Sequence, residues 1–173
     1  MNVHYLKNVI AVFHQYKKLA EDAMSQIDDV GLNFTPHQDS NSIVLIVKHM
    51  SGNMLSRWTD FLTSDGEKPW RKRDSEFESG AEETRDGLMQ RWDKGWTCLF
   101  HALDSLYEED LNQTVLIRSQ PLSIFEAVNR QLAHYSYHVG QIIYIAKLYK
   151  GSSFASLSIP KNKSNDFNSG LMK

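Results

Sequence analysis

The sequence predicts an all-α protein, a four-helix bundle, on the basis of three observations. Apolar residues recur at spacings of three and four along four long segments, which is the period of an amphipathic helix. Proline interrupts helices, and the only four prolines of the 173-residue chain fall between or after these segments. The connection between the second and third segments is far longer than a turn, as in bundles with a crossover along the helices.

The first helix is expected from about Val3 to Asp28, before Gly31 and Pro36 break the pattern. Its apolar stripe consists of Leu6, Val9, Ile10, Phe13, Tyr16, Ala20, Met24 and Ile27.

The second helix is expected from about Ser42 to Leu62. Its opening, SIVLIV, also fits a buried strand, because short apolar runs do not distinguish the two. The helix is favoured because the spacing continues through Met50, Met54, Trp58 and Phe61.

A long crossover, TSDGEKPWRKRDSEFESG, follows this helix. Connections of this length without regular structure are uncommon and often functional. Its cations Lys68, Arg71, Lys72 and Arg73 permit two interpretations: an anion-binding rim above a site in the bundle, or a solvated loop with cancelling charges. The second is favoured, because acidic residues are interspersed throughout: Asp65, Glu67, Asp74, Glu76 and Glu78.

The third helix is expected to start at Ser79, because Glu82 lies at the capping-box spacing from it. Its stripe is Leu88, Trp92, Trp96, Leu99, Leu103 and Leu106. The β-like string TVLIRSQPLS after it predicts one small hairpin.

The fourth helix opens with a second capping box, Ser123 and Glu126, and Gly151 is suited to end it. Residues beyond Pro160 are polar and predict a loosely ordered tail, so we expect one domain, residues 1–160, and a tail, residues 161–173. The buried face of the fourth helix is expected to comprise Phe125, Val128, Leu132, Tyr135, Val139, Ile142 and Ala146.

Charge and composition narrow the function classes. The net charge of −2 argues against a nucleic-acid binder, which usually carries an excess of positive charge. No apolar run approaches the ~20 residues that span a bilayer, and the first residues are too polar for a signal peptide. The single cysteine, Cys98, is interpreted as a small core residue in a reducing compartment. We therefore expect a cytoplasmic protein with no nucleic-acid or membrane partner.

The motif HYSYH places His134 and His138 four residues apart on the fourth helix, where both can reach one metal ion. The pair alone also fits two surface or hydrogen-bonded core histidines. His49 adds a third imidazole on the apolar second helix, where it must be hydrogen-bonded, paired or ligated. Three imidazoles from two facing helices, with the fourth position left to water, match the open geometry of catalytic zinc.

The histidine in the second helix, the long crossover and the histidine pair in the fourth helix resemble the pattern of the DinB/YfiT-like superfamily. The strings GNMLSRWTDFLTSDGEKPWRKRDSEF, HYSYHVGQIIYIAK and SIPKNKSNDFN are similar to its uncharacterised DinB-like subfamily of about this length. The resemblance covers nearly the whole chain. It implies up-down-down-up helix connections, a divalent ion such as zinc or nickel held by His49, His134 and His138, and often a homodimer.

The resemblance also implies a chemistry. Characterised relatives include bacillithiol S-transferases and a mycothiol-dependent maleylpyruvate isomerase, in which the metal is thought to hold the thiol cofactor as a thiolate. The expected function is accordingly a metal-dependent enzyme that transfers a low-molecular-weight thiol, such as bacillithiol, to an electrophilic small-molecule substrate. The alternative is a non-catalytic helical dimer that binds a metal or small ligand.

No catalytic base and no thiol-binding residue can be assigned from this resemblance. The side chains expected to support the metal ligands are Asn53, Arg57, Tyr137 and Gln141.

Overall fold

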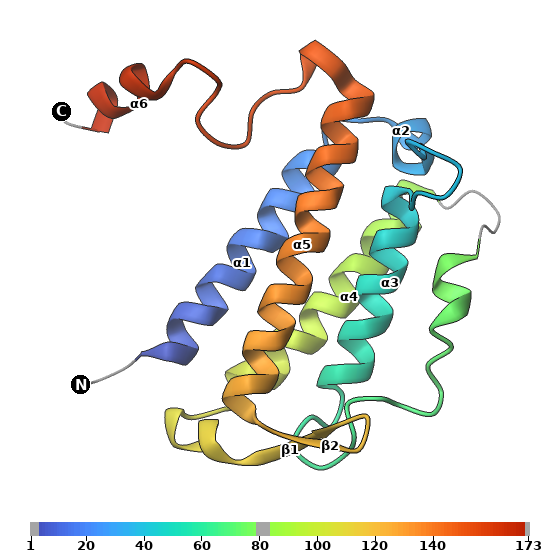
Figure 1. Cartoon of the computed structure of the whole chain (residues 1–173), viewed down its shortest axis with the longest axis vertical. Helices are drawn as coiled ribbons and strands as arrows, with labels where there is room; N and C mark the ends of the chain where they lie inside the picture. Colours follow the sequence, from blue (N-terminus) through green and yellow to red (C-terminus); the bar gives the residue numbers. More distant parts are fainter. Residues whose placement is uncertain (1–3, 79–83, 172–173) are drawn as a thin grey trace.

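Four long helices form the body of the computed structural model, which describes residues 4–78 and 84–171. They are α1 (Tyr5–Met24), α3 (Ile43–Trp58), α4 (Arg85–Asp104) and α5 (Ile124–Lys150). Figure 1 shows them side by side, with α1 and α5 ascending the view while α3 and α4 descend. The closest pairings are α3 with α4 and α1 with α5. The prediction of a mostly helical protein is confirmed.

Short elements connect the long helices. A turn of helix, α2 (Asp29–Asn33), follows α1, and a 3₁₀ turn, η1 (Asp74–Phe77), lies within the crossover. The 3₁₀ turn η2 (Glu108–Asn112) precedes the predicted hairpin, which consists of β1 (Thr114–Ile117) and β2 (Gln120–Ser123). A last 3₁₀ turn, η3 (Gly151–Ser153), follows α5.

Local capping sets the helix boundaries. The first helix ends before Asp28, because that carboxylate caps α2 by accepting a hydrogen bond from the Gly31 N–H (2.8 Å). The helix α3 ends at Trp58, short of Leu62, and Asp60 adopts a left-handed conformation (φ 48°) just beyond it.

The two predicted capping boxes have different outcomes. The expected start of the third helix at Ser79 and Glu82 lies outside the described residues, and α4 begins at Arg85 with Thr84 as its cap. The capping box at Ser123 and Glu126 is present. The backbone N–H of Ser123 donates to the Glu126 carboxylate, and the backbone N–H of Glu126 donates to the Ser123 hydroxyl.

Two expectations about the C-terminal third are wrong. Phe125 is 44% exposed rather than part of the buried face, and it packs against the ring of Tyr5 on the outside of the bundle. The tail contains a helix, α6 (Ser164–Leu171), which Figure 1 shows leading away from the end of α5. The division into a domain, residues 1–160, and a tail, residues 161–173, stays a prediction.

The core between the helices is aromatic. Phe13, Trp96 and Tyr135 are fully buried and contact one another at centroid distances of 6.0–6.2 Å. The Tyr135 hydroxyl accepts from the Trp58 indole (3.2 Å) and donates to Asn53 Oδ1 (2.9 Å), so its polar atom is satisfied inside the core. Cys98 is half-buried and packs against this core. In the described part of the chain, no helix combines the length and apolarity that crossing a membrane requires.

A glycine on α4 makes the close approach to α3 possible. A Cβ atom at Gly95 would lie 3.0 Å from the Ser51 Cα, which is backbone and cannot rotate away.

We therefore expect Gly95→Ala to lower the free energy of unfolding by about 1–3 kcal/mol, as overpacking of a core does. Gly140→Ala is the matched control, because its Cβ would meet nothing within 4 Å. That change should stabilise α5 by about 0.5–1 kcal/mol. Urea denaturation measures both, and equal effects of the two changes would contradict the close approach.

Candidate metal centre

The three predicted histidines meet between α3 and α5. His49 Nε2 lies 3.3 Å from His134 Nε2, and His138 Nε2 lies 3.1 Å from the same atom. His49 and His138 are buried, His134 is partly buried, and one nitrogen from each lies within 4.8 Å of the others. The three side chains together can hold a metal ion.

The nitrogen spacing fits one small divalent ion. Two nitrogens that each lie about 2.05 Å from a tetrahedral zinc ion are about 3.3 Å apart. The two Nε2–Nε2 distances of 3.3 Å and 3.1 Å are close to that value.

The hydrogen bonds of the three rings support the same conclusion. The Nδ1–H of His49 donates to Glu76 Oε2 (2.9 Å), and the Nδ1–H of His138 donates to Gln141 Oε1 (2.8 Å). A neutral imidazole carries one proton, so the Nε2 atoms of both histidines present lone pairs. Both face His134 Nε2, which carries at most one proton and can satisfy only one of them. A cation between the three nitrogens would satisfy all of them.

Burial keeps the imidazoles of His134 and His138 neutral, as metal ligation requires. Burial, followed by the proximity of His138 and His49, lowers the pKa of His134 to about 3. Burial also lowers the pKa of His138 to about 4, although its hydrogen bond to Gln141 acts in the opposite direction.

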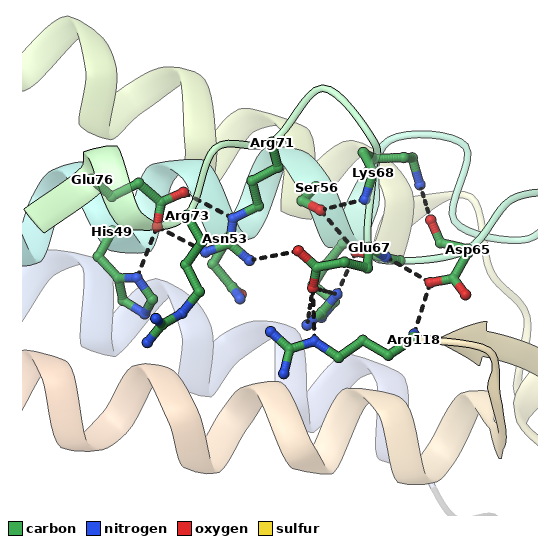
Figure 2. Close-up of polar contacts among 12 residues, drawn as sticks. His49, Asn53, Ser56, Asp65, Glu67, Lys68, Arg71, Arg73, Glu76 and Arg118 are labelled. Carbon is green, nitrogen blue, oxygen red and sulfur yellow. Dashed lines mark hydrogen bonds and ion pairs between the residues drawn. The ribbon is translucent and has the colours of Figure 1, made fainter.

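Glu76 fixes the orientation of His49 from the crossover. It lies in η1 and accepts hydrogen bonds from Arg71 Nε (2.8 Å) and Nη2 (2.9 Å) as well as from His49 (Figure 2). Burial alone would raise the pKa of Glu76, but the hydrogen bonds from His49 and Arg71 hold it below its usual value. A carboxylate behind a ligating histidine fixes the tautomer and the direction of the ring.

Gly52 makes room for that carboxylate. It lies on α3 one turn after His49, and a Cβ atom there would collide with Oε1 of Glu76. A side chain at this position would therefore displace the Glu76 carboxylate from its place beside α3.

The interpretation of the crossover as a solvated loop is wrong for its central residues. The side chain of Arg71 is only 2% exposed, and Lys68 and Glu76 are buried. It holds for Lys72, Asp74 and Glu78, which are exposed. The acidic residues do offset the cations, but through specific buried ion pairs rather than as interspersed charges on a solvated loop.

The four residues expected to support the ligands have different positions. Gln141 hydrogen-bonds His138, whereas Asn53 accepts from Tyr135 in the core. Tyr137 is exposed and its ring contacts those of His134 and His138. Arg57 is buried and pairs with Glu67, away from the ligand nitrogens. The residues that sequence reasoning missed are Glu76, as a partner of His49, and Gly52.

A pocket of about 570 Å³ opens beside the three histidines. No acidic side chain of the described residues lines it. Five of its lining residues are arginines from α3, the crossover, the hairpin turn and α5: Arg57, Arg71, Arg73, Arg118 and Arg130.

Fold and site together define a mostly helical protein with a three-histidine cluster that can hold a metal ion. A family model matches residues 1–163, and the chain belongs to that family, "Protein of unknown function (DUF1572)". Neither the curated proteins nor the solved structures contain a match to this chain.

The carboxylate behind His49 gives a test of the site. We expect Glu76→Gln to lower the affinity for zinc by about 10–100-fold, the usual effect of losing such a partner. Gly52→Ala should act in the same direction, because the added methyl group displaces Glu76. Zinc affinity is measured by competition with a chromogenic chelator. Glu78→Gln is the control, since Glu78 is an exposed acid on the same segment; equal affinity in all four proteins would contradict the role of Glu76.

The lowered histidine pKa values predict how metal-free protein responds to acid. An unfolded histidine titrates near 6.5, whereas the pKa values of His134 and His138 are about 3 and about 4 in the folded chain. Between these values the unfolded chain binds more protons, so stability present above about pH 6.5 is lost as the pH falls towards 4. Urea denaturation in chelator should show a lower midpoint at pH 5 than at pH 7. The difference should shrink in His134→Gln and persist in His101→Gln, which changes an exposed histidine outside the cluster. A difference that does not shrink in His134→Gln would contradict the assignment.

Proposed function

We propose that this protein is a divalent-metal-dependent enzyme of the DinB-like superfamily that transfers a low-molecular-weight thiol to an electrophilic small molecule. The observation that carries the metal site is the convergence of three Nε2 atoms with too few protons to satisfy one another. The directions of the four long helices in Figure 1, up, down, down and up in chain order, support the superfamily assignment. The proposal includes zinc or nickel as the metal, a cytoplasmic location and a homodimer.

The donor set suits a metal that stays available to a ligand. Three neutral imidazoles leave the charge of a divalent ion uncompensated, and the pocket borders all three rings. When bound, a divalent ion would supply the positive charge that keeps a coordinated thiol deprotonated at neutral pH.

The chain's own residues position the ligands and exclude competing acid–base chemistry. Glu76 and Gln141 hold the Nδ1 protons of His49 and His138, so neither ring can rotate without losing a hydrogen bond. No carboxylate, lysine or cysteine of the described residues lines the pocket. The proton of the thiol must therefore leave to solvent before the sulfur forms its bond to the electrophilic carbon and the leaving group departs with its electron pair.

The same lack of a general base favours the second candidate, a helical dimer that binds a metal or small ligand and performs no reaction. In that function, the histidines and the pocket would hold a ligand without transforming it. If the dimer binds a metal, the two candidates share the metal site and differ only in turnover.

The first measurement that tests the proposal is the metal content of untagged protein. We expect about one zinc or nickel ion per chain, and loss of the ion in His134→Ala because one of three imidazole ligands is removed. His101→Ala, at an exposed position, is the control that keeps the metal. Wild-type protein that neither contains nor takes up these ions would eliminate the metal site and the transferase, and would leave only a dimer that binds a small ligand.

The second measurement is thiol consumption by metal-loaded protein. Bacillithiol, glutathione or coenzyme A is supplied with monochlorobimane, from which the thiolate displaces chloride. We expect turnover that chelator abolishes, that is absent in His134→Ala and that His101→Ala retains. Background consumption with a filled metal site would replace the transferase with the binding function.

A further inference from the structure

The pocket has two chemically different ends because two helices present matched ladders of side chains. On α3, His49, Asn53 and Arg57 follow one another at intervals of four residues, which places them on one face. On α5, Arg130, His134 and His138 do the same. The two helices run in opposite directions in Figure 1, so the histidines meet at one end and Arg57 and Arg130 lie towards the other.

Three further arginines join from outside the two helices. Arg71 and Arg73 come from the crossover, and Arg118 comes from the hairpin turn. Figure 2 shows Arg73 and Arg118 reaching towards α5, into the space that the His49 ring also faces.

Within residues 4–78 and 84–171, the carboxylates of Glu67 and Glu76 pair with three of these arginines, Arg57, Arg71 and Arg118. Glu67 Oε2 accepts hydrogen bonds from Arg118 Nε (3.0 Å) and from Arg57 Nη1 (3.3 Å). Glu76 accepts a hydrogen bond from Arg71 Nε (2.8 Å). Even with the nearby Asp65 and Asp74 counted, five guanidinium groups leave an excess of positive charge around the pocket. This excess is local, because the whole chain has a net charge of −2.

Two of the five arginines, Arg73 and Arg130, are exposed and lack a carboxylate partner that is shielded from solvent. Among the described residues, Arg73 is paired only with Asp74, at 3.6 Å, and the side chain of Asp74 is 99% exposed, so solvent screens the pair. Arg130 forms no ion pair within residues 4–78 and 84–171.

We propose that the pocket binds a small molecule with at least two anionic groups, carboxylate or phosphate, held by Arg73, Arg130 and Arg57 while the rest of the molecule reaches the histidines. The exclusive use of arginine supports these groups, because its planar fork matches carboxylate and phosphate oxygens in pairs. The inference rests on the proposed function in that it names the charge class of the small molecule on which the site acts.

The test is a binding measurement on both metal-loaded and metal-free protein by isothermal titration calorimetry. The probes are succinate, with two carboxylates, butyrate, with one, succinamide, with none, and inorganic phosphate. We expect succinate or phosphate to bind at least about tenfold more tightly than butyrate, since removing one charge-assisted hydrogen bond weakens binding by roughly that factor. Whichever of the two binds better identifies the anionic group as carboxylate or phosphate.

Variants separate a specific contact from a general charge effect. Arg73→Gln and Arg130→Gln should each weaken binding of the preferred probe by about fivefold or more, and Arg130→Lys should restore only part of it. Lys94→Gln, which removes an exposed cation from α4, should bind as the wild type does. Binding of neither succinate nor phosphate more tightly than butyrate, no binding of any probe at millimolar concentration, or an equal effect of Lys94→Gln would overturn the proposal.

The two proposals fail separately. Anion binding to metal-free protein does not depend on thiol transfer, so it can hold in a protein that consumes no thiol. Loss of anion binding with thiol consumption intact would overturn the charge class and leave the transferase in place.

Discussion

Burial of the Glu76 carboxylate is the constraint on which the site depends. A carboxylate in a protein interior is costly unless charged or hydrogen-bonding partners surround it. Glu76 has His49 on one side and Arg71 on the other, and Gly52 gives it room against α3. One carboxylate therefore links the ring of a candidate metal ligand, the crossover and a pocket arginine.

The same kind of link continues along the crossover to the hairpin. Asp65 accepts hydrogen bonds from the backbone N–H groups of Arg118 (2.8 Å) and Ser119 (2.6 Å), which occupy the left-handed turn between β1 and β2. Glu67 then joins Arg118 to Arg57 on α3. Carboxylates at alternate positions of the crossover thus build the pocket wall by charge, whereas the bundle beneath it is held by aromatic and aliphatic packing. Changes in salt concentration or pH should therefore weaken the ion pairs of the pocket wall under conditions that leave the apolar packing of the bundle intact.

Sequence reasoning succeeded where the signal is local. The apolar period gave the helices, the Ser123–Glu126 box gave the start of α5, and four-residue spacing gave the His134–His138 pair. It failed for Glu76, because five acids lie in the crossover and nothing local shows which one reaches a helix 27 residues away. A usable signal was Gly52: glycine inside a helix costs about 1 kcal/mol, so an interior glycine one turn from a candidate ligand indicates a close approach.

The two ends of the pocket differ in charge, because burial neutralises imidazoles but not guanidinium groups. Arginine keeps its proton in proteins, so the arginine end is permanently cationic. Imidazoles can lose theirs, and burial, the other two histidines and then Arg57 and Arg71 lower the pKa of His134. The arginines thereby help to keep the nitrogen lone pairs free for a metal, yet they also repel the metal's charge. An anion bound at the arginine end would relieve that repulsion, and by thermodynamic reciprocity a metal at the histidines would tighten the anion. In the proposed function, the arrangement of charge would therefore couple the two halves of the pocket, so that metal and anion would favour each other's binding.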